Sequence, residues 1–501
     1  MLKKVIGLLK RYGVWYTAKK IICKLYISFI LGPVRINRKI SKRDRAEQEV
    51  WHFLNPVCFS IVVPLYNTPE TFLREMLESV RMQTYKNWQL CLADGSDQEH
   101  PYVQTVCEDY IKRDDRICYR KLDENRGISE NTNACIDMAA GEYIALFDHD
   151  DLLHPSALFE VMKCIEEKKA DFIYTDEATF QGRETHLLSV HRKPDFYMEN
   201  LRANNYICHF TVFNKDVLKQ SGVFRREFDG SQDHDLILRL CEKASMICHI
   251  PKVLYFWRAH KDSVAFRIDS KNYAVEAGLR AVRSHMERCG IRATVSLTHN
   301  AMSVYQVNYD LGRLSVQDIT VLCEQEYEET GKSTWQAVED SCSYILILKK
   351  GLLVPEKQDL ERLLMHMVDY NIAAVTGKIV NEQGKIISGG VAFRENNGQF
   401  HIRHLFGGVP VCDPGYMNQL TYASGIPVIC NGCILVRKEH VVAALKYGRN
   451  LFDLSDWIRW SIDLREQGYQ LINETRTLIV ANKNFPWYNK KVMFIFKRKC
   501  E

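Results

Sequence analysis

An alternation of apolar, strand-length runs with helical patterns is the feature that most limits how this chain can fold. Residues 59–64 form a β-branched run that ends at a proline, and the helical segment after it carries one apolar face. Further strands are expected at 88–93, 116–122, 143–147 and 171–175, with helices at 128–139 and 157–168. Near-continuous apolar strands separated by helices predict an α/β fold, with a mostly parallel sheet covered by helices on both faces.

Polar side chains follow these runs wherever a strand is expected to end. Parallel strands place their carboxyl ends at one edge of a sheet, where ligands bind in open α/β folds, so these side chains are expected to converge. They are Tyr66 and Asn67 after the first strand, Asp94 and Asp97 after the second, residues 148–151 after the fourth, and Asp176 with Glu177 after the fifth. Their convergence predicts a ligand site at that edge.

The stretch Asp148-His149-Asp150-Asp151 places three carboxylates directly after an apolar strand. Three acids at one strand end repel one another, so a positive partner is expected there. Carboxylate oxygen is the ligand type that suits Mg²⁺ or Mn²⁺. The alternative is a solvated acidic turn that caps the helix that follows.

Two later features add candidate residues. Asp233 and Asp235 stand at the start of an apolar helix, where the helix dipole favours carboxylates and where Asp233 can simply act as a cap. A pair of strands over 250–258 leads to His260. A histidine in isolation is more often structural than functional, so His260 depends on its context.

In order and spacing, these motifs resemble the catalytic domain of family 2 glycosyltransferases, which have the GT-A type fold. The resemblance covers about 59–266 and depends on 62–67, 93–96, 125–127 with Asn133, 141–143, the DXD-type 148–150, and 232–235. Residues 174–177, 193–196, 205–207 and 228–260 are also similar to large bacterial transferases that build cell-surface polysaccharides such as O-antigen, capsule or rhamnan.

The resemblance implies a role for each matched position. Asp233 is expected to be the general base that deprotonates the acceptor hydroxyl. Asp150 and His260 are expected to bind the cation. Asp148 is expected either to contact the ribose or to act as a further ligand of the cation. Donor contacts are implied for Pro64, Tyr66, Asn67, Asp94, Asn125, Gly127, Asn133 and Asp148, with Asp94 at the nucleotide base. The implied acceptor-side positions are Asp176, Glu177, Gln232 and Trp257.

The implied activity is that of a metal-dependent, inverting glycosyltransferase of the hexosyl or deoxyhexosyl class. The donor would be a UDP- or dTDP-sugar, the cofactor Mn²⁺ or Mg²⁺, and the acceptor a lipid-linked or growing cell-surface polysaccharide. The alternative is a non-catalytic membrane-surface scaffold that binds nucleotide-sugar or glycan in a polysaccharide assembly complex. The chain departs from the family pattern at two positions: Thr132 stands in place of a common arginine and Ala93 in place of a common acid. Both departures affect the expected contacts with the nucleotide.

A weaker copy of the same pattern begins after about residue 296. Residues 344–355 parallel 143–155, but Leu348, Lys349, Lys350 and Gly351 fall on the positions of the acidic stretch when the two prolines are matched. Lysines cannot build a site for a metal and a diphosphate. We therefore expect a catalytic domain at 58–292 and a degenerate, catalytically silent GT-A-like domain at 296–482, with a second active transferase as the alternative. The sequence leaves its role open between acceptor binding, dimerisation and bracing of the first domain.

The basic charge of the chain is concentrated at its N-terminus. Residues 1–45 contain thirteen Lys and Arg against one acid, a net charge of +12, which leaves −7 for the rest of a chain with +5 overall. Residues 1–33 interleave this charge with apolar residues at helical spacing. We therefore expect the segment 1–50 to be a basic amphipathic helical region on an anionic membrane surface, with packing on the body as the alternative. No groove-reading motif accompanies the charge, so nucleic acid is not an expected partner.

The tail at 483–501 mixes aromatic and basic residues, which also suits a membrane interface. No stretch approaches the ~20 uncharged apolar residues needed to cross a bilayer. The 17 cysteines show no regular spacing, and most lie inside apolar runs, which indicates reduced thiols in a reducing compartment. The expected location is cytoplasmic and peripheral, on the inner face of the cell membrane, and a homo-oligomer is left open.

Overall fold

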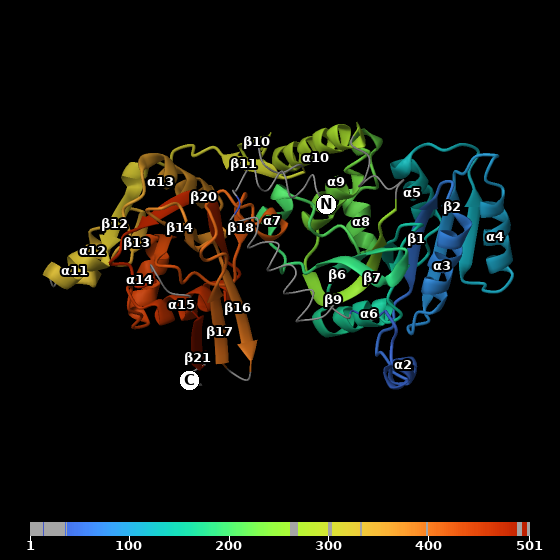
Figure 1. The fold of residues 1–501 in the computed structure, drawn as a ribbon, viewed down its shortest axis with the longest axis horizontal. Helices are drawn as coiled ribbons and strands as arrows, with labels where there is room; N and C mark the ends of the chain where they lie inside the picture. Colours follow the sequence, from blue (N-terminus) through green and yellow to red (C-terminus); the bar gives the residue numbers. More distant parts are fainter. Residues whose placement is uncertain are drawn as a thin grey trace. The chain divides into compact units, whose positions relative to one another are not determined.

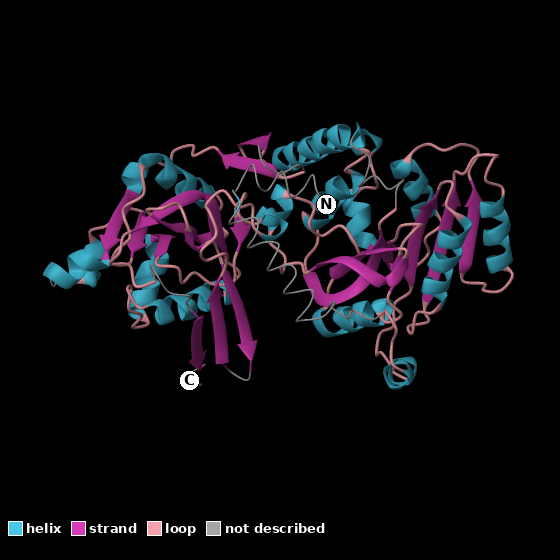
Figure 2. Cartoon of the chain, in the orientation of Figure 1, coloured by secondary structure: helices cyan, strands magenta, loops and turns pink. Residues whose placement is uncertain are grey.

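The computed structural model describes residues 38–260, 269–298, 303–330, 333–396, 399–487 and 493–497, together with positions 14 and 36. The chain divides into two compact units, which Figures 1 and 2 draw as ribbons. The first unit comprises 1–194, 207–226 and 240–271, and the second comprises 195–206, 227–239 and 272–501. Within the described ranges, every helix is too short or too polar to span a bilayer.

Four parallel strands form one half of the first unit's sheet. Their order is β3 (Ile117–Lys121), β2 (Trp88–Asp94), β1 (Phe59–Leu65) and β4 (Tyr143–Leu146). Every residue of β1 is buried, because helices cover both faces of a parallel sheet. The helices of this half are α3 (Glu70–Arg81), α4 (Tyr102–Ile111) and α5 (Ile128–Asp137), and α3 buries the apolar face that its spacing predicts.

The other half of the sheet mixes parallel and antiparallel pairs. Next to β4 lies the antiparallel β8 (Thr211–Asn214), followed by β6 (Phe172–Gln181), β9 (Ile247–Arg258) and β5 (Leu152–Leu153), while β7 (Arg183–His191) pairs with β6. The α/β class is confirmed, but the sheet is parallel throughout only in its first half. The sequence did not reveal β8, because its four residues run directly into α8 (Lys215–Ser221) without a turn signal.

The second unit has its own sheet in the order β12 (Ile319–Cys323), β13 (Tyr344–Leu348), β19 (Cys433–Arg437), β14 (Ile372–Asn381), β20 (Gln470–Ala481) and β18 (Ser424–Gly425), with β15 (Ile386–Ser388) on β14. This order repeats part of the first sheet. β12 is parallel to β13 as β1 is to β4, β19 is antiparallel to β13 as β8 is to β4, and β20 is parallel to β14 as β9 is to β6. Among the described strands of this sheet, none corresponds to β2 or β3.

The remaining elements complete both units. In the first they are α2 (Lys42–Glu49) and α6 (Ala157–Lys168), and both η1 (Arg226–Phe228) and α9 (Gln232–Cys241) contain a division between the units. In the second they are α7 (Met198–Ala203), α10 (Asp269–Arg288), β10 (Ala293–Leu297), β11 (Tyr305–Tyr309), η2 (Val316–Asp318), α11 (Glu324–Thr330), α12 (Thr334–Glu339), α13 (Lys357–Leu364), η3 (Met365–Val368), η4 (Tyr416–Asn418), α14 (Lys438–Lys446) and α15 (Leu454–Glu466). A separate three-stranded sheet contains β16 (Val391–Asn396), β17 (Gln399–His404) and β21 (Met493–Lys497).

The two terminal segments are described only in part. The helix expected over 1–33 lies outside the described residues except for position 14, and α2 is the helix described within 1–50. In the tail, 483–487 and β21 are described, and the rest of 483–501 lies outside the described residues.

Candidate active site

The carboxylates after β4 differ in their surroundings. Asp151 is fully buried and accepts hydrogen bonds from the Tyr255 hydroxyl at 2.5 Å and from the backbone N–H of Arg258 at 2.6 Å. Burial, together with the nearby charges of Asp150 and Asp148, raises the pKa of Asp151 well above its usual range. The side chain of Asp148, in contrast, is 46% exposed. Asp151 therefore holds β9 to the acidic stretch.

Asp150 and His260 meet at the end of the sheet. Oδ2 of Asp150 lies 2.7 Å from Nε2 of His260, and the ring of Phe72 packs against the imidazole. The Arg258 Nε donates to the backbone carbonyl of Asp150 at 2.6 Å and holds it in place. Two residues that are 110 positions apart in the chain are thus brought into contact.

This pair fits two ligand positions of one divalent cation. In an octahedral site with bonds of about 2.1 Å, neighbouring ligand atoms are about 3 Å apart, close to the separation found between the carboxylate and the imidazole. A Mg²⁺ site in a phosphate-binding enzyme commonly takes one or two protein ligands and fills its other positions with substrate phosphate and water. Asp150 and His260 would therefore provide two protein ligands of such a site.

The sequence did not single out His209, Tyr255 and Arg258, which surround the acidic stretch. The His209 ring stacks on Tyr255 at 4.7 Å between centroids, and its Nδ1 lies 3.9 Å from Oδ2 of Asp148. Arg258 is buried over the ring of Phe72 and pairs with Glu75 at 2.6 Å. Tyr255 and Arg258 lie within the apolar run of β9, which indicates a strand and gives no signal for a site residue. His209 belongs to no recognisable motif.

Asp94 lies at the end of β2 and is fully buried. Its carboxylate accepts from the Tyr119 hydroxyl at 2.7 Å, from Lys121 Nζ at 3.1 Å and from the Ser96 N–H at 2.8 Å. The burial of Tyr119 and its hydrogen bond to Asp94 raise the pKa of the Tyr119 hydroxyl. A contact between Asp94 and a nucleotide base, which the sequence predicts, therefore requires Tyr119 or Lys121 to give way.

The turn after β1 is held to the turn after β2. Asn67 adopts a φ of 49°, donates through Nδ2 to Asp97 at 2.7 Å and receives the Asp97 N–H at 3.1 Å. Pro64 is buried within β1, whereas Tyr66 is 46% exposed. Of these three predicted donor residues, Tyr66 presents the most accessible side chain.

The predicted donor residues near α5 mainly shape their own loop. The Asn125 Oδ1 accepts from the Gly127 N–H at 3.0 Å and from Asn131 Nδ2 at 2.9 Å, and Gly127 has a φ of 95° that favours glycine. Asn133 exchanges two hydrogen bonds of 3.0 Å with the backbone of Phe224. Asn133 therefore anchors the loop before η1 with both ends of its amide.

Asp176 and Glu177, predicted on the acceptor side, are buried within an ion network. Asp176 accepts from Arg192 at 2.9 Å and contacts His249 Nε2 at 3.0 Å. Glu177 pairs with Lys193 at 3.1 Å and with His191 at 2.8 Å. Burial alone would raise the pKa of Glu177, but the charge of Lys193 and the His191 contact lower it to about 2.

These contacts leave neither Asp176 nor Glu177 facing solvent. Trp257, the other acceptor-side candidate in this unit, is partly buried, with its ring 5.9 Å from that of His209.

Asp233 stands in the first turn of α9 and belongs to the second unit. It accepts a hydrogen bond of 2.9 Å from Asn205 Nδ2 and one of 2.9 Å from the His234 N–H. The side chain of Gln232 accepts from the Gly230 N–H at 2.9 Å. The predicted general base and the predicted metal ligands therefore belong to different units of the chain.

The comparison with known proteins matches a segment that lies mainly in the first unit. The family model of glycosyl transferase family 2 matches residues 60–222. An uncharacterised protein y4gI of Sinorhizobium fredii is 42% identical over 247 residues, covering 49% of this chain and 27% of the relative. The O-antigen biosynthesis protein RfbC of Myxococcus xanthus is 32% identical over 273 residues, covering 54% of this chain and 21% of the relative. The chain thus spans about a quarter of the length of these relatives.

Among solved structures, residues 1–349 of TarS from S. aureus in complex with UDP-GlcNAc align with a TM-score of 0.39 and 19% identity, covering 46% of this chain and 66% of that chain. Residues 60–222 of the chain are a glycosyl transferase family 2 domain, as the sequence motifs predict.

Proposed function

We propose that this protein transfers a sugar from a nucleotide-sugar donor to a glycan, with the help of a divalent cation. The observation that carries the proposal is the pair of Asp150 and His260, 2.7 Å apart at the end of the sheet of a glycosyl transferase family 2 domain. The neighbouring acid Asp151 is buried and accepts from the Arg258 N–H, so its role is structural and not part of the pair.

Asp150 and His260 would hold Mn²⁺ or Mg²⁺, with Asp148 as a further ligand or a ribose contact. Bound there, the cation supplies positive charge that stabilises the leaving diphosphate. Arg258 donates to the backbone carbonyl of Asp150 and so keeps this residue in position. The Asp150 carboxylate would therefore need little reorganisation when it binds the cation.

Asp233 would act as the general base. It removes the proton of the acceptor hydroxyl while that oxygen attacks the anomeric carbon opposite the diphosphate, which inverts the configuration at that carbon. The place of Asp233 in the first turn of α9 and the hydrogen bond of 2.9 Å that it accepts from Asn205 Nδ2 support this role, because they fix the position of its carboxylate.

The donor in this proposal is a UDP- or dTDP-linked hexose or deoxyhexose, and the acceptor is a lipid-linked or growing cell-surface polysaccharide. The RfbC relative is named for O-antigen biosynthesis, which supports an acceptor of this class. The second domain, at 296–482, is a silent copy in this proposal. At its strand end Lys349 contacts Glu324 and donates to the Phe452 carbonyl at 2.6 Å, while Lys350 pairs with Glu328 at 2.7 Å.

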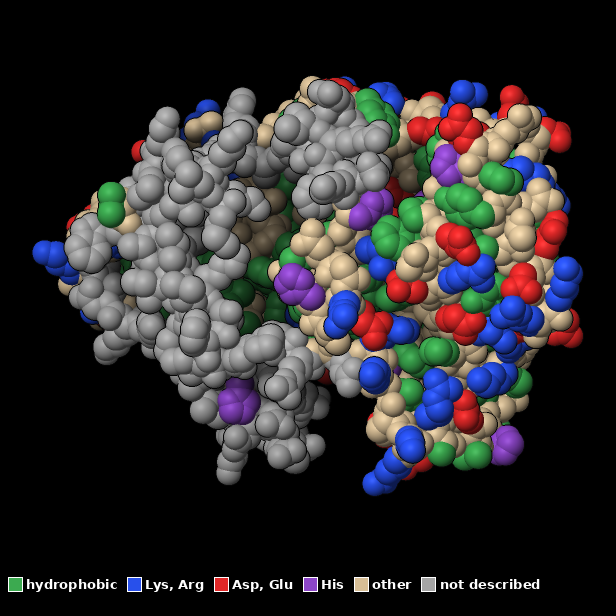
Figure 3. All heavy atoms as spheres, turned by 45° about the vertical axis from the view of Figure 1, so that its right-hand side comes forward, with side chains coloured by type: hydrophobic (Ala, Val, Ile, Leu, Met, Phe, Trp, Pro, Cys, Tyr) green, Lys and Arg blue, Asp and Glu red, His purple; other side chains and the backbone are tan. Residues whose placement is uncertain are grey.

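The protein would work on the inner face of the membrane. Directly after α2 the chain exposes three apolar side chains, Val50 at 69%, Trp51 at 50% and Leu54 at 86%. In Figure 3, Lys and Arg side chains gather with hydrophobic ones at the lower end of the first unit, where α2 lies. Apolar residues beside a segment of +12 charge suit an anionic bilayer surface.

A donor screen tests the proposal. Purified protein with MnCl₂ is heated with a panel of UDP-, dTDP- and GDP-sugars, and the correct donor raises the melting temperature by mass action. Asp233→Asn should bind the same donor without transferring it to an acceptor, whereas Asp216→Asn, with a side chain 76% exposed, should behave as the parent. No stabilisation by any nucleotide-sugar, together with no sugar transfer, would contradict the proposal.

A further inference from the structure

The helix α7 lies in sequence between two strands of the first sheet but belongs to the second unit. It is docked on β18, where the Gly425 N–H donates to Asn200 Oδ1 at 2.8 Å. Gly425 also lies against Tyr197, so that an added Cβ there would be only 1.9 Å from the tyrosine ring. This close approach ties α7 to the edge of the second sheet.

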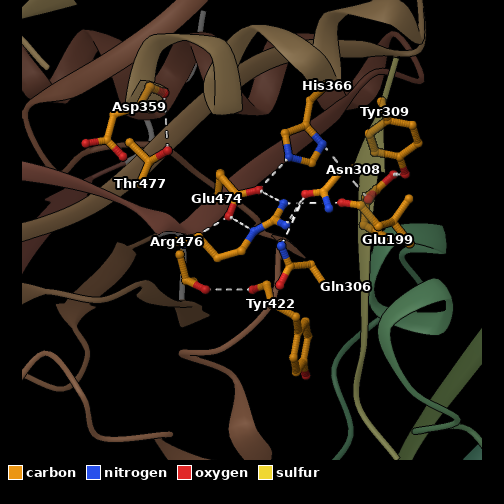
Figure 4. A network of polar contacts seen from close by, with 12 residues as sticks. Glu199, Gln306, Asn308, Tyr309, Asp359, His366, Tyr422, Glu474, Arg476 and Thr477 are labelled. Atoms are coloured by element: carbon orange, nitrogen blue, oxygen red, sulfur yellow. Dashed lines mark hydrogen bonds and ion pairs between the residues drawn. The ribbon is translucent and has the colours of Figure 1, made fainter. Parts of the chain in front are cut away.

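A buried polar network reinforces this attachment (Figure 4). On the α7 side, Glu199 accepts from the Tyr309 hydroxyl at 2.5 Å and from Arg202 Nη1 at 2.8 Å. The same Arg202 donates to the Tyr309 oxygen at 2.9 Å and contacts His285 Nε2 at 3.1 Å. These side chains are all at least nine-tenths buried. Because water cannot reach them, the charges of Glu199 and Arg202 are stabilised by each other and by the polar side chains around them.

The network continues to β20, the strand next to the edge strand β18 of the second sheet. Arg476 donates to Glu474 on β20 at 2.8 Å and 2.5 Å, and His366 Nε2 contacts Glu474 at 3.0 Å. The other ring nitrogen of His366 lies 4.0 Å from Glu199. Burial opposes the charge of Glu474, but Arg476 outweighs it and lowers the pKa of this carboxyl. His366 therefore contacts Glu474 on β20 and lies next to Glu199 of α7.

Residues on and just after α7 contact the start of α9. Asn205 donates to Asp233 Oδ2 at 2.9 Å. The neighbouring His234 is buried, and its Nε2 donates to the Leu201 carbonyl at 2.7 Å. Asp233 and the residue after it are thus both held by the segment that the buried network attaches to the second sheet.

We propose that the second sheet acts in sugar transfer by positioning Asp233 through α7. The inference rests on the proposed role of Asp233 as the base. Glu199, Tyr309 and Asn205 are positioning residues, because they act through Asp233 and not on the substrate. Positioning of Asp233 is a role that the second unit can perform without a donor site of its own.

Two conservative substitutions test the link. Tyr309→Phe removes the hydroxyl that joins Glu199 and Arg202, while Tyr344→Phe makes the same change at an equally buried tyrosine of the second sheet, whose hydroxyl accepts from Arg437. Hydrogen exchange should accelerate by about threefold or more in 198–206 and 231–236 in Tyr309→Phe only, because local opening becomes easier. Asn205→Ala, at a partly exposed side chain, provides a milder second variant.

Activity gives the second measurement. Nucleotide release in the presence of acceptor is measured with MnCl₂ and a donor panel of UDP- and dTDP-sugars. Tyr309→Phe and Asn205→Ala should each lower kcat in this assay by about three- to tenfold. The KM for the donor and the shift in melting temperature caused by UDP should stay as in the parent. Asn205→Gln, which keeps the amide donor, should recover part of the loss. Unchanged exchange in both segments, or an unchanged kcat in both folded variants, would overturn the inference. If exchange responds but Asp233→Asn remains active, the positional link stands and the proposed base fails.

Discussion

Asp150 and Asp151 are neighbours in the chain, yet the structure predicts opposite effects when each is replaced by alanine. Asp151→Ala removes a fully buried carboxylate that accepts from the Tyr255 hydroxyl and the Arg258 N–H. Asp150→Ala removes a carboxylate whose partner is His260, and it keeps the backbone carbonyl that accepts from Arg258. The first change should damage the fold, and the second should damage only the chemistry.

The size of the difference follows from these contacts. Each buried donor left without an acceptor costs about 1–3 kcal/mol, so the two donors freed in Asp151→Ala together cost about 4 kcal/mol. In a unit of this size, each kcal/mol lowers the melting temperature by about 2–4 °C, which gives a fall of about 12 °C. The partly exposed pair of Asp150 and His260 contributes about 1 kcal/mol or less, so Asp150→Ala should melt within a few degrees of the parent.

Thermal unfolding by circular dichroism measures the first quantity, and nucleotide release from the donor found by screening, with MnCl₂, measures the second. Asp150→Ala should show the parent's melting temperature and no measurable sugar transfer. Asp151→Ala should melt early and retain transfer at a temperature where it is still folded. Equal destabilisation by the two substitutions would refute the distinction between a structural and a ligand-binding acid, as would full transfer by Asp150→Ala.

Three further predictions concern the metal, acid and the membrane. His260→Ala should raise the Mn²⁺ concentration for half-maximal activity by about tenfold or more, measured by adding MnCl₂ to chelator-treated protein, and an unchanged requirement would remove His260 from the site. Glu177 has a pKa lowered from 4.5 to about 2, so its stabilising contribution is complete above pH 4.5 and is lost as the pH falls towards 2. Urea unfolding should therefore show a smaller loss of stability over this range in Glu177→Gln than in the parent, and parallel curves would count against the ion network. Leu54→Ser should weaken sedimentation with phosphatidylserine vesicles by about tenfold, whereas Tyr447→Ser, at another exposed apolar side chain, should not, and equal binding by all three proteins would refute membrane contact at this turn.

Local patterns in the sequence predict the elements that form the site. The helix expected at 157–168 is α6 (Ala157–Lys168), and the strand expected at 143–147 is β4 (Tyr143–Leu146). The α/β class and the family are confirmed. These features depend on the spacing of apolar residues and on motif order, both of which are visible within a few dozen residues.

Burial of the polar candidates could not be predicted in this way. Asp176 and Glu177 are expected to follow a strand that ends at 175, but this expectation is wrong: both lie within β6 (Phe172–Gln181), where His249 and Lys193, from other parts of the chain, enclose them. Asp94 is likewise covered by Tyr119 and Lys121 of the neighbouring strand. Whether a strand-end acid faces a ligand or an internal partner depends on residues brought near by the fold, which sequence spacing does not show.

The second sheet provides an internal comparison for the site. The bridge Leu352–Ala481 corresponds to the pairing of Leu152 with Phe256 in the first sheet, which sets the register between the two copies. Counting two residues back from each leucine places Lys350 on Asp150. Counting four residues on from each partner places Phe485 on His260.

Phe485 is buried in the core of the second unit, and its backbone leaves no room for a Cβ on Gly351, the counterpart of Asp151. The same order of strands therefore forms with a lysine and a phenylalanine in the place of the carboxylate and the imidazole. The fold of the second unit therefore forms without a carboxylate and an imidazole at these positions, which supports the proposed role of Asp150 and His260 in ligand binding. The same reasoning separates them from Asp151, whose burial and two hydrogen bonds have a structural explanation.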